Sequence, residues 1–172
     1  ATILENRLKA LRFKTERRTS NVGVGADTVI GRLTGTGRQN VMLMAHMDTV
    51  CEKGILQSQP YKIEGNRLYG PGIADDKGGI AVILHALKIL ADLGWTDYAT
   101  LTVLFNPDEE LGSPGSRDIV GELAEQSDTV LSFEPTGTQA TGAWLLLGTA
   151  TYVSVRMEVQ GRASHAGGAH DA

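Results

Sequence analysis

The sequence predicts an α/β domain whose mixed, largely parallel sheet is flanked by helices. Short apolar runs rich in β-branched residues alternate with longer runs of helical periodicity, which is typical of strand–helix–strand units. Three of the short runs end in residues with metal-binding side chains. At 172 residues the chain favours a single domain with one core.

The first half of the chain should contain one helix and several strands. Residues 2–11 carry their leucines and isoleucine on one stripe, as an amphipathic helix does. Gly65-Asn66 is a favourable turn for a hairpin. The strands are expected at 13–19, 28–33 and 41–45, with the hairpin at 61–69.

The second half gives the strongest helix signal, at residues 77–93. Apolar residues cover most of its circumference, so we expect it to be largely buried. Asp76 is a candidate N-cap, and Gly94 a candidate first residue beyond the helix. A second helix is expected at 114–126, with Ser113 as its N-cap. The strands are expected at 101–105, 130–133, 145–147 and 151–159.

The residues that follow three of these strands indicate a metal site. In open α/β sheets the ligand crevice lies beyond the carboxyl ends of the strands. So many acids in one crevice would force most of them to stay protonated, unless divalent cations compensate their charge. The sequence therefore predicts a dinuclear metal site, and the side chains that we expect to meet there are His46, Asp48, Asp75, Glu109, Glu110 and Glu134.

Each of these residues alone has a simpler structural interpretation. His46 and Asp48, two apart on a strand, would share a face as a core histidine and its hydrogen-bonded partner. Acids at a helix start cap the helix, a role that we accept for Asp76, whereas Asp75 is free to face the crevice. Their joint occurrence at successive strand ends favours the metal site.

Four motifs together resemble the M20 zinc metallopeptidases, and most closely their glutamate carboxypeptidases of the carboxypeptidase G type. The motifs occur in the family's order and spacing over nearly the whole chain, and they are His46-Met47-Asp48-Thr49-Val50, Gly70-Pro71-Gly72-Ile73-Ala74-Asp75-Asp76-Lys77-Gly78-Gly79, Asn106-Pro107-Asp108-Glu109-Glu110 and Phe133-Glu134-Pro135.

The resemblance implies two zinc ions bridged by Asp75. His46 and Glu134 would complete the protein ligands of one ion, and Glu110 would bind the other. The family also tends to hold the peptide bond after the bridging aspartate, here Asp75-Asp76, in the cis form.

The resemblance also implies the reaction, which is metal-assisted hydrolysis of a peptide or amide bond. The substrate would be a small peptide or an N-acyl amino acid, and the product a C-terminal glutamate-like residue. Asp48 would orient His46, and Glu109 would take a proton from a metal-bridged water and pass it to the leaving amine.

Two other functions stay open as alternatives. An N-acyl-amino-acid deacylase would use the same family chemistry on a different substrate. A nucleotide-binding domain is suggested by the glycines of Gly23-Val24-Gly25 and Gly35-Thr36-Gly37. Those glycines lack the third glycine and the strand-to-helix context that a dinucleotide fingerprint needs.

The resemblance further predicts that residues 1–161 are the N-terminal part of the catalytic domain. Ala163-Ser164-His165-Ala166-Gly167 resembles the opening of the family's lid and dimerisation domain, so residues 162–172 would begin a lid whose remainder is absent. There the family's histidine, here His165, stabilises the oxyanion in the partner subunit's site. We expect the second zinc's distal histidine to lie beyond Ala172. The second site would then be incomplete, this chain alone inactive, and the parent enzyme a homodimer.

The composition excludes other classes of protein. The formal net charge is −4, with no basic stripe, which argues against a nucleic-acid or anionic-membrane partner. No apolar run approaches the roughly 20 residues that span a bilayer. The single cysteine, Cys51, rules out an internal disulfide framework. Nothing in the sequence indicates a cellular compartment.

Overall fold

A computed structural model of the chain describes residues 1–19, 26–135, 147, 157–158 and 160. The chain divides into two units, residues 1–137 and 138–172. All the helices and strands described below lie in the first unit. The strands expected at 145–147 and 151–159 fall outside the described ranges except at isolated positions, and so does the expected domain boundary after residue 161.

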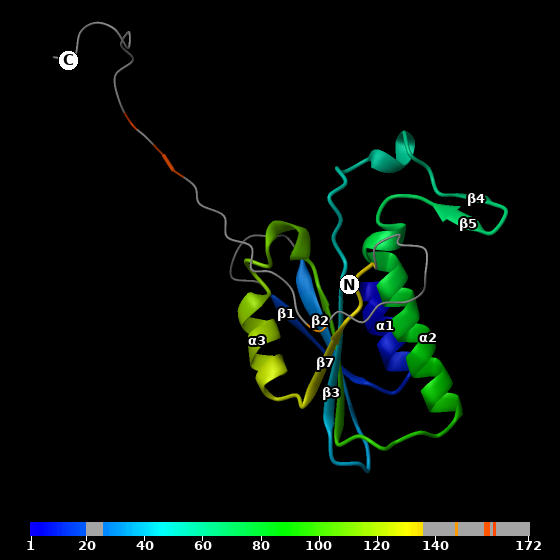
Figure 1. Cartoon of the computed structure of the whole chain (residues 1–172), viewed down its shortest axis with the longest axis vertical. Coiled ribbons are helices and arrows are strands. Elements are labelled where there is room, and N and C mark those ends of the chain that lie inside the picture. The colour runs from blue at the N-terminus through cyan, green and yellow to red at the C-terminus, as the bar shows by residue number, and fades with distance from the viewer. Residues whose placement is uncertain (20–25, 136–146, 148–156, 159, 161–172) are drawn as a thin grey trace, which may run out of the picture. The chain divides into compact units, whose positions relative to one another are not determined.

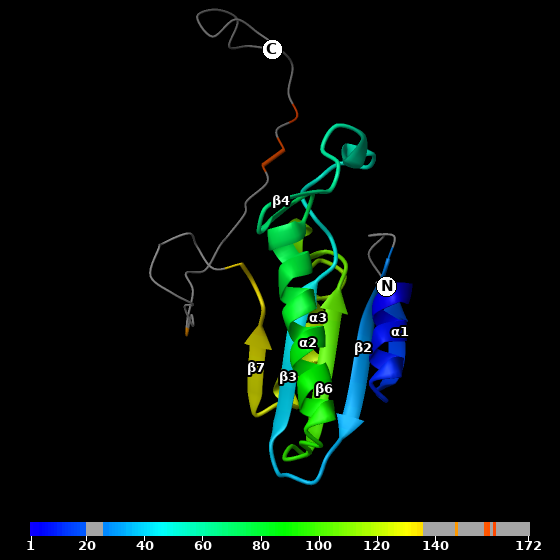
Figure 2. The same ribbon diagram turned by 90° about the vertical axis from the view of Figure 1, so that its right-hand side faces the viewer.

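A five-stranded sheet forms the centre of the first unit (Figure 2). The two pairs that join β1 to β2 and β2 to β6 are antiparallel, whereas β3 runs parallel to both β6 and β7. The predicted mixed α/β sheet is therefore confirmed, and in spatial order its strands are β1 (Lys14–Thr19), β2 (Asp27–Thr34), β6 (Thr100–Asn106), β3 (Asn40–His46) and β7 (Thr129–Ser132).

Helices cover both faces of this sheet (Figure 1). Helices α1 (Thr2–Ala10) and α2 (Gly79–Asp92) lie on one face, and α3 (Arg117–Glu125) lies on the other. The chain leaves β3 through α2 to reach β6, then returns through α3 to β7 on the other side of β3. The connections thus reverse direction at β3, and this is where an α/β sheet opens a crevice beyond its carboxyl ends.

Alternate residues of the central strands enter two separate cores. Val29, Leu43 and Val103 pack with α1 and α2, whereas Met42 and Leu104 pack with α3. Successive side chains of a strand point to opposite faces, and here both faces are covered. This arrangement explains why β3 and β6 are almost continuously apolar.

Helix α2 is less buried than its sequence indicated. Ile80, Ile83 and Leu87 are buried against the sheet, but Val82 and Ile89 are 55% and 56% exposed. The expectation of a largely buried helix is therefore wrong. An apolar composition all round the helix could not indicate which of its faces packs.

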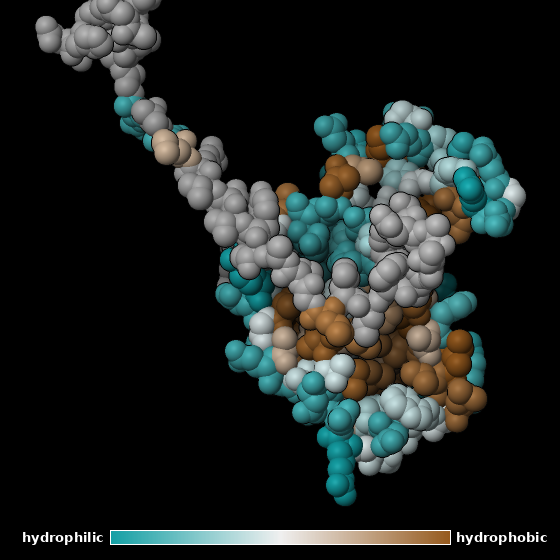
Figure 3. All heavy atoms as spheres, viewed as in Figure 1, coloured by the Kyte–Doolittle hydropathy of each residue, from teal (hydrophilic) through white to brown (hydrophobic). Residues whose placement is uncertain are grey.

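The last described strand lies at an edge of the sheet, and the last helix begins later than expected. Val130 and Leu131 of β7 are 40% and 38% exposed because β7 is an edge strand of the described sheet, not a buried one. Figure 3 shows hydrophobic surface between the positions of β7 and α2. Helix α3 begins at Arg117 rather than Pro114, because Ser113 has a positive φ of 55° and the chain turns before the helix starts.

The segment between β3 and α2 contains small elements. The predicted hairpin is confirmed as β4 (Lys62–Glu64) and β5 (Arg67–Tyr69), joined through Gly65 with a φ of 61°. A short 3₁₀ turn, η1 (Ile55–Gln57), precedes it. Across the described ranges, no helix combines the length and the apolarity that a membrane span requires.

Gly79, the first residue of α2, is needed because two groups approach its Cα closely. A Cβ there would collide with the main-chain oxygen of Phe133 and with the carboxylate of Asp76. This contact holds the start of α2 against the residue that precedes Glu134.

Replacing Gly79 with Ala should therefore lower the free energy of unfolding by about 1–3 kcal/mol, as overpacking does. Gly121→Ala in α3 is the matched control, because a Cβ there meets nothing within 4 Å. The control should raise stability by about 0.5–1 kcal/mol. Urea denaturation measures both changes, and a Gly79→Ala protein as stable as the wild type would contradict the packing described.

Candidate metal centre

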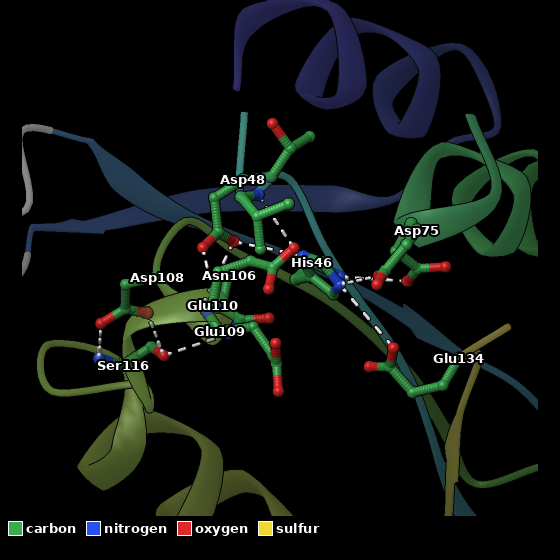
Figure 4. Close-up of polar contacts among 12 residues, drawn as sticks. His46, Asp48, Asp75, Asn106, Asp108, Glu109, Glu110, Ser116 and Glu134 are labelled. Atoms are coloured by element: carbon green, nitrogen blue, oxygen red, sulfur yellow. Dashed lines mark hydrogen bonds and ion pairs between the residues drawn. The ribbon is translucent and has the colours of Figure 1, made fainter. Parts of the chain in front are cut away.

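The carboxyl ends of the parallel strands bring the predicted site residues together (Figure 4). His46 is the last residue of β3, and Glu134 follows β7. Glu109 and Glu110 open a 3₁₀ turn, η3 (Glu109–Leu111), just after β6. Asp75 comes from the turn η2 (Ile73–Gly78), where its dihedral angles are not helical.

One imidazole and two carboxylates form the centre of this cluster. The His46 ring is buried, and its Nε2 lies 2.7 Å from Asp75 Oδ1 and 3.7 Å from Glu134 Oε2. One ligand atom from each of the three residues lies within 4.8 Å of the others. In the part of the chain that the structure describes, this is the only group of three or more such side chains.

The three residues fit a zinc ion. Zinc binds nitrogen and oxygen at about 2.0–2.2 Å, so two ligands of a tetrahedral ion lie roughly 3.3–3.6 Å apart. The His46–Glu134 distance is close to this range, and the side chain of Asp75 is 50% exposed, which leaves it free to move the short distance required. Three protein ligands with one open position are typical of catalytic zinc.

Asp48 lies beside this group but directs its hydrogen bonds elsewhere. Its Oδ1 is 3.3 Å from Nδ1 of His46, without the alignment of a hydrogen bond, and Nδ1 has no hydrogen-bond partner among the described residues. The Asp48 carboxylate instead accepts the main-chain N–H groups of Glu109, at 3.2 Å, and Glu110, at 3.0 Å. Asp48 therefore contacts both the histidine and the glutamate pair.

Asp76 is buried, and its carboxylate joins the start of α2 to His46. Its carboxylate accepts the N–H of Gly79 at 3.1 Å, three residues on, as an N-capping residue does. It also accepts the N–H of His46 at 3.3 Å. The Asp75-Asp76 peptide bond is cis, as the resemblance implied. Asp76 thus makes the hydrogen bond expected of a cap, but the residue directly before the regular helix is Gly78, not Asp76.

Burial and the crowding of acids perturb the pKa values of this cluster. Burial raises the pKa of Glu134 to about 6, and nearby Asp76 adds to the shift while His46 opposes it. Burial also raises the pKa of Glu109. For His46 burial lowers the pKa, but the hydrogen bond to Asp75 and the surrounding carboxylates outweigh it, so the net direction is upward. A bound cation would relieve this excess of negative charge.

The raised pKa of Glu134 gives the metal-free protein a specific pH dependence. The folded state keeps the proton up to about pH 6, whereas the unfolded chain releases it near 4.5. Protonated Glu134 therefore contributes its full share to the stability of the folded state below pH 4.5, and this share is lost as the pH rises through 6. In EDTA, urea denaturation should show stability falling across this interval in the wild type.

Glu134→Gln should remove this part of the pH dependence, and Glu64→Gln on the exposed hairpin should leave it unchanged. Equal pH profiles for the wild type and Glu134→Gln would contradict the environment described for Glu134.

Comparison with known proteins tests the resemblance. The model of "Peptidase family M20/M25/M40" matches residues 42–164. The chain belongs to the M20 peptidase family. It is 53% identical to carboxypeptidase G2 of a Pseudomonas species over an alignment of 166 residues. This alignment covers 96% of this chain and 40% of that protein. It is also 32% identical to acetylornithine deacetylase of Aliivibrio fischeri over an alignment of 135 residues. This alignment covers 76% of this chain and 34% of that enzyme.

Solved M20 structures share this fold. The metallo-carboxypeptidase Sso-CP2 from Sulfolobus solfataricus matches with a TM-score of 0.65 at 21% identity, over 77% of this chain and 31% of its own. Aminopeptidase PepT from Bacillus cereus matches with a TM-score of 0.66 at 22% identity, over 79% and 37%. Membership of this family implies metal dependence and supports a hydrolase. The chain spans less than half the length of each of these relatives.

Other residues of interest lie outside the central group. Glu110 is not part of it, and its Oε1 accepts the N–H of Val50 at 3.1 Å. His165, expected to act in a partner's site, lies outside the described residues, as does His170. His85 is exposed on α2.

The nucleotide-binding alternative finds no support in the described residues. The turn at Gly35-Thr36-Gly37 joins β2 to β3 and leads to a strand rather than to a helix. A dinucleotide fingerprint opens a helix. The glycines at 23 and 25 lie outside the described ranges.

Sequence reasoning missed three buried polar residues behind the glutamate pair, namely Asn106, Asp108 and Ser116. Asp108 precedes Glu109 directly, so in the sequence it was one of three adjacent acids. Only the fold distinguishes it, because its side chain lies beside Ser116, away from His46 (Figure 4). No sequence pattern indicated its contact with Ser116, eight residues further along the chain.

Proposed function

We propose that this chain is part of a zinc-dependent hydrolase that cleaves a peptide or amide bond and releases a C-terminal glutamate-like amino acid. The observation that carries the proposal is the group of His46, Asp75 and Glu134, with Glu109 beside it. The 53% identity to carboxypeptidase G2 supports the carboxypeptidase reaction over others of the family.

His46, Asp75 and Glu134 would hold one zinc ion, and Asp75 and Glu110 would contribute to a second. When bound, the ions would polarise the scissile carbonyl and make a water molecule more acidic. Glu109 is proposed as the general base, which accepts the proton of that water and delivers it to the leaving amine. Its raised pKa suits this task, because a base is most effective when its pKa lies near the working pH.

Zinc removal and restoration test this function in the full-length protein. EDTA should abolish the release of glutamate from an N-acyl glutamate substrate, and added zinc should restore it. Activity that survives complete removal of metal would contradict the proposal.

A second candidate is an N-acyl-amino-acid deacylase acting on a non-glutamate substrate. The 32% identity to acetylornithine deacetylase favours it as the alternative. The ratio of kcat/KM for N-acyl glutamate to that for N-acetylornithine separates the two. We expect the glutamate substrate to be preferred, and the opposite preference would select the deacylase.

The division of the chain is also a proposal. Residues 1–161 would belong to the catalytic domain, and residues 162–172, with His165, to the start of a lid through which the enzyme dimerises. The second ion would then need a histidine from elsewhere in the protein. Calorimetric titration of the 172-residue chain should give one zinc bound more tightly than the second, with little hydrolase activity. Two equally tight sites, or substantial turnover, would contradict this.

A further inference from the structure

A fully buried carboxylate, Asp108, lies directly behind the Glu109–Glu110 pair. It is 0% exposed, and no cation lies within ion-pair distance of it in the described part of the chain. Its Oδ2 accepts the N–H groups of Gly115, at 2.6 Å, and Ser116, at 3.1 Å. Its Oδ1 accepts the hydroxyl of Ser116 at 2.5 Å.

These three donors explain how Asp108 is buried without a cation. Hydrogen bonds from amide and hydroxyl groups to a carboxylate are among the stronger ones, and they replace water around the charge. Ser116 also stands immediately before the nine-residue helix α3, whose N-terminus carries a partial positive charge. The loop that follows Asp108 therefore supplies the groups that stabilise it.

The same contacts close the loop that carries the glutamate pair. The main-chain oxygen of Asp108 accepts the N–H of Ser113 at 2.8 Å, and its side chain holds Ser116. Asn106 at the end of β6 donates from Nδ2 to the Ser116 hydroxyl oxygen at 3.3 Å. Both ends of the loop at 109–116 are thus tied to the end of β6.

Asp48 holds the pair from the opposite side. It accepts the main-chain N–H groups of Glu109 and Glu110, as described above. The pair therefore lies between two carboxylates, with Asp48 on the side of His46 and Asp108 on the side of Ser116 (Figure 4).

We propose that Asp108 is a positioning residue that fixes the Glu109–Glu110 segment through the 109–116 loop, and so sets the place of the general base. The inference rests on the proposed function of Glu109. A general base must come within about 2.6–3.2 Å of the group whose proton it takes. A misplacement of about 1 Å can cost on the order of 100-fold in rate. Asp108 acts only through the backbone that it holds.

Asp108→Ala and Asp108→Asn in the full-length protein separate this role from simple stability. The alanine removes the acceptor for all three donors. The asparagine can still accept both amides through Oδ1 and can donate to the Ser116 hydroxyl oxygen. Val103→Ala is the matched control. Val103 is a fully buried residue of β6, the strand that precedes Asp108, and the core in which it packs contains no residue of the 109–116 loop.

Asp108→Ala should lower kcat by roughly 10- to 100-fold per folded, zinc-loaded molecule, with KM changed by less than about threefold. Hydrogen exchange of the Glu109 and Glu110 amides should become faster. Asp108→Asn should recover kcat to within several-fold of the wild type and slow the exchange again. Val103→Ala should lower the thermal midpoint yet keep kcat.

The inference fails if Asp108→Ala keeps the wild-type kcat and amide exchange, or if Val103→Ala loses as much kcat. If Asp108→Ala does not fold, Ser116→Ala removes one of the three bonds, and it should show a smaller loss of kcat with faster exchange of the same two amides. A wild-type protein without zinc-dependent hydrolysis would refute the proposed function instead. In that case the exchange measurement still decides whether Asp108 holds the pair.

Discussion

Replacing Glu109 with Gln should lower kcat by roughly two to four orders of magnitude, as the loss of a general base does. The amide is nearly isosteric but cannot accept the proton of the attacking water. Glu109 lies outside the group formed by His46, Asp75 and Glu134, so the zinc content should stay close to that of the wild type. Steady-state kinetics and metal analysis of the full-length protein measure the two quantities.

Glu125→Gln on the exposed side of α3 is the control, and it should change neither quantity. Glu110→Gln should instead weaken the binding of one zinc ion. A Glu109→Gln protein that loses zinc would show that Glu109 is a ligand, and the role of base would then belong to another residue.

Replacing Asp75 with Ala should have the largest effect on metal binding. We propose that Asp75 serves both ions, so its loss should weaken both and abolish hydrolysis. The loss of affinity should exceed the roughly 10- to 100-fold that removing a ligand's hydrogen-bond partner costs. Zinc titration by calorimetry measures it directly.

Asp118→Asn in the first turn of α3 provides the control, because this aspartate is exposed and lies outside the metal-ligand group. An Asp75→Ala protein that keeps one zinc at wild-type affinity would mean that Asp75 does not belong to that ion's site. Retention of both ions would refute the site as described.

The candidate site was predictable because its residues follow strands. Each of β3, β6 and β7 has an apolar run that can be recognised in the sequence, and the carboxyl ends of parallel strands share one edge of a sheet. His46 and Glu134 could therefore be assigned to one site, although 87 residues lie between them in the sequence. Asp75 could be added because Asp76 caps the helix.

Packing decided what the sequence could not. The apolar residues of α2 gave no indication that Val82 and Ile89 would be exposed, since a helix that is apolar all round has no face marked for the core. The positive φ of Ser113 delayed the start of α3, and serine is not a residue from which that conformation is expected.

Hydrogen bonds over long sequence distances were equally hidden. The resemblance implied that Asp48 orients His46, but nothing in the sequence indicated that its carboxylate also accepts the amides of Glu109 and Glu110, about sixty positions away. In the sequence Asp108 is one of three adjacent acids, and only the folded structure shows that its carboxylate accepts the hydroxyl of Ser116. Such pairings depend on where the loops meet, which residue patterns do not encode locally.

We propose above that His46, Asp75 and Glu134 bind one metal ion. Crystals of the protein grown with zinc, measured on both sides of the zinc absorption edge, test it most directly. We expect an anomalous peak about 2.0–2.2 Å from His46 Nε2 and from one carboxylate oxygen of each acid. A peak elsewhere, or no peak at these three residues in zinc-saturated crystals, would contradict the account.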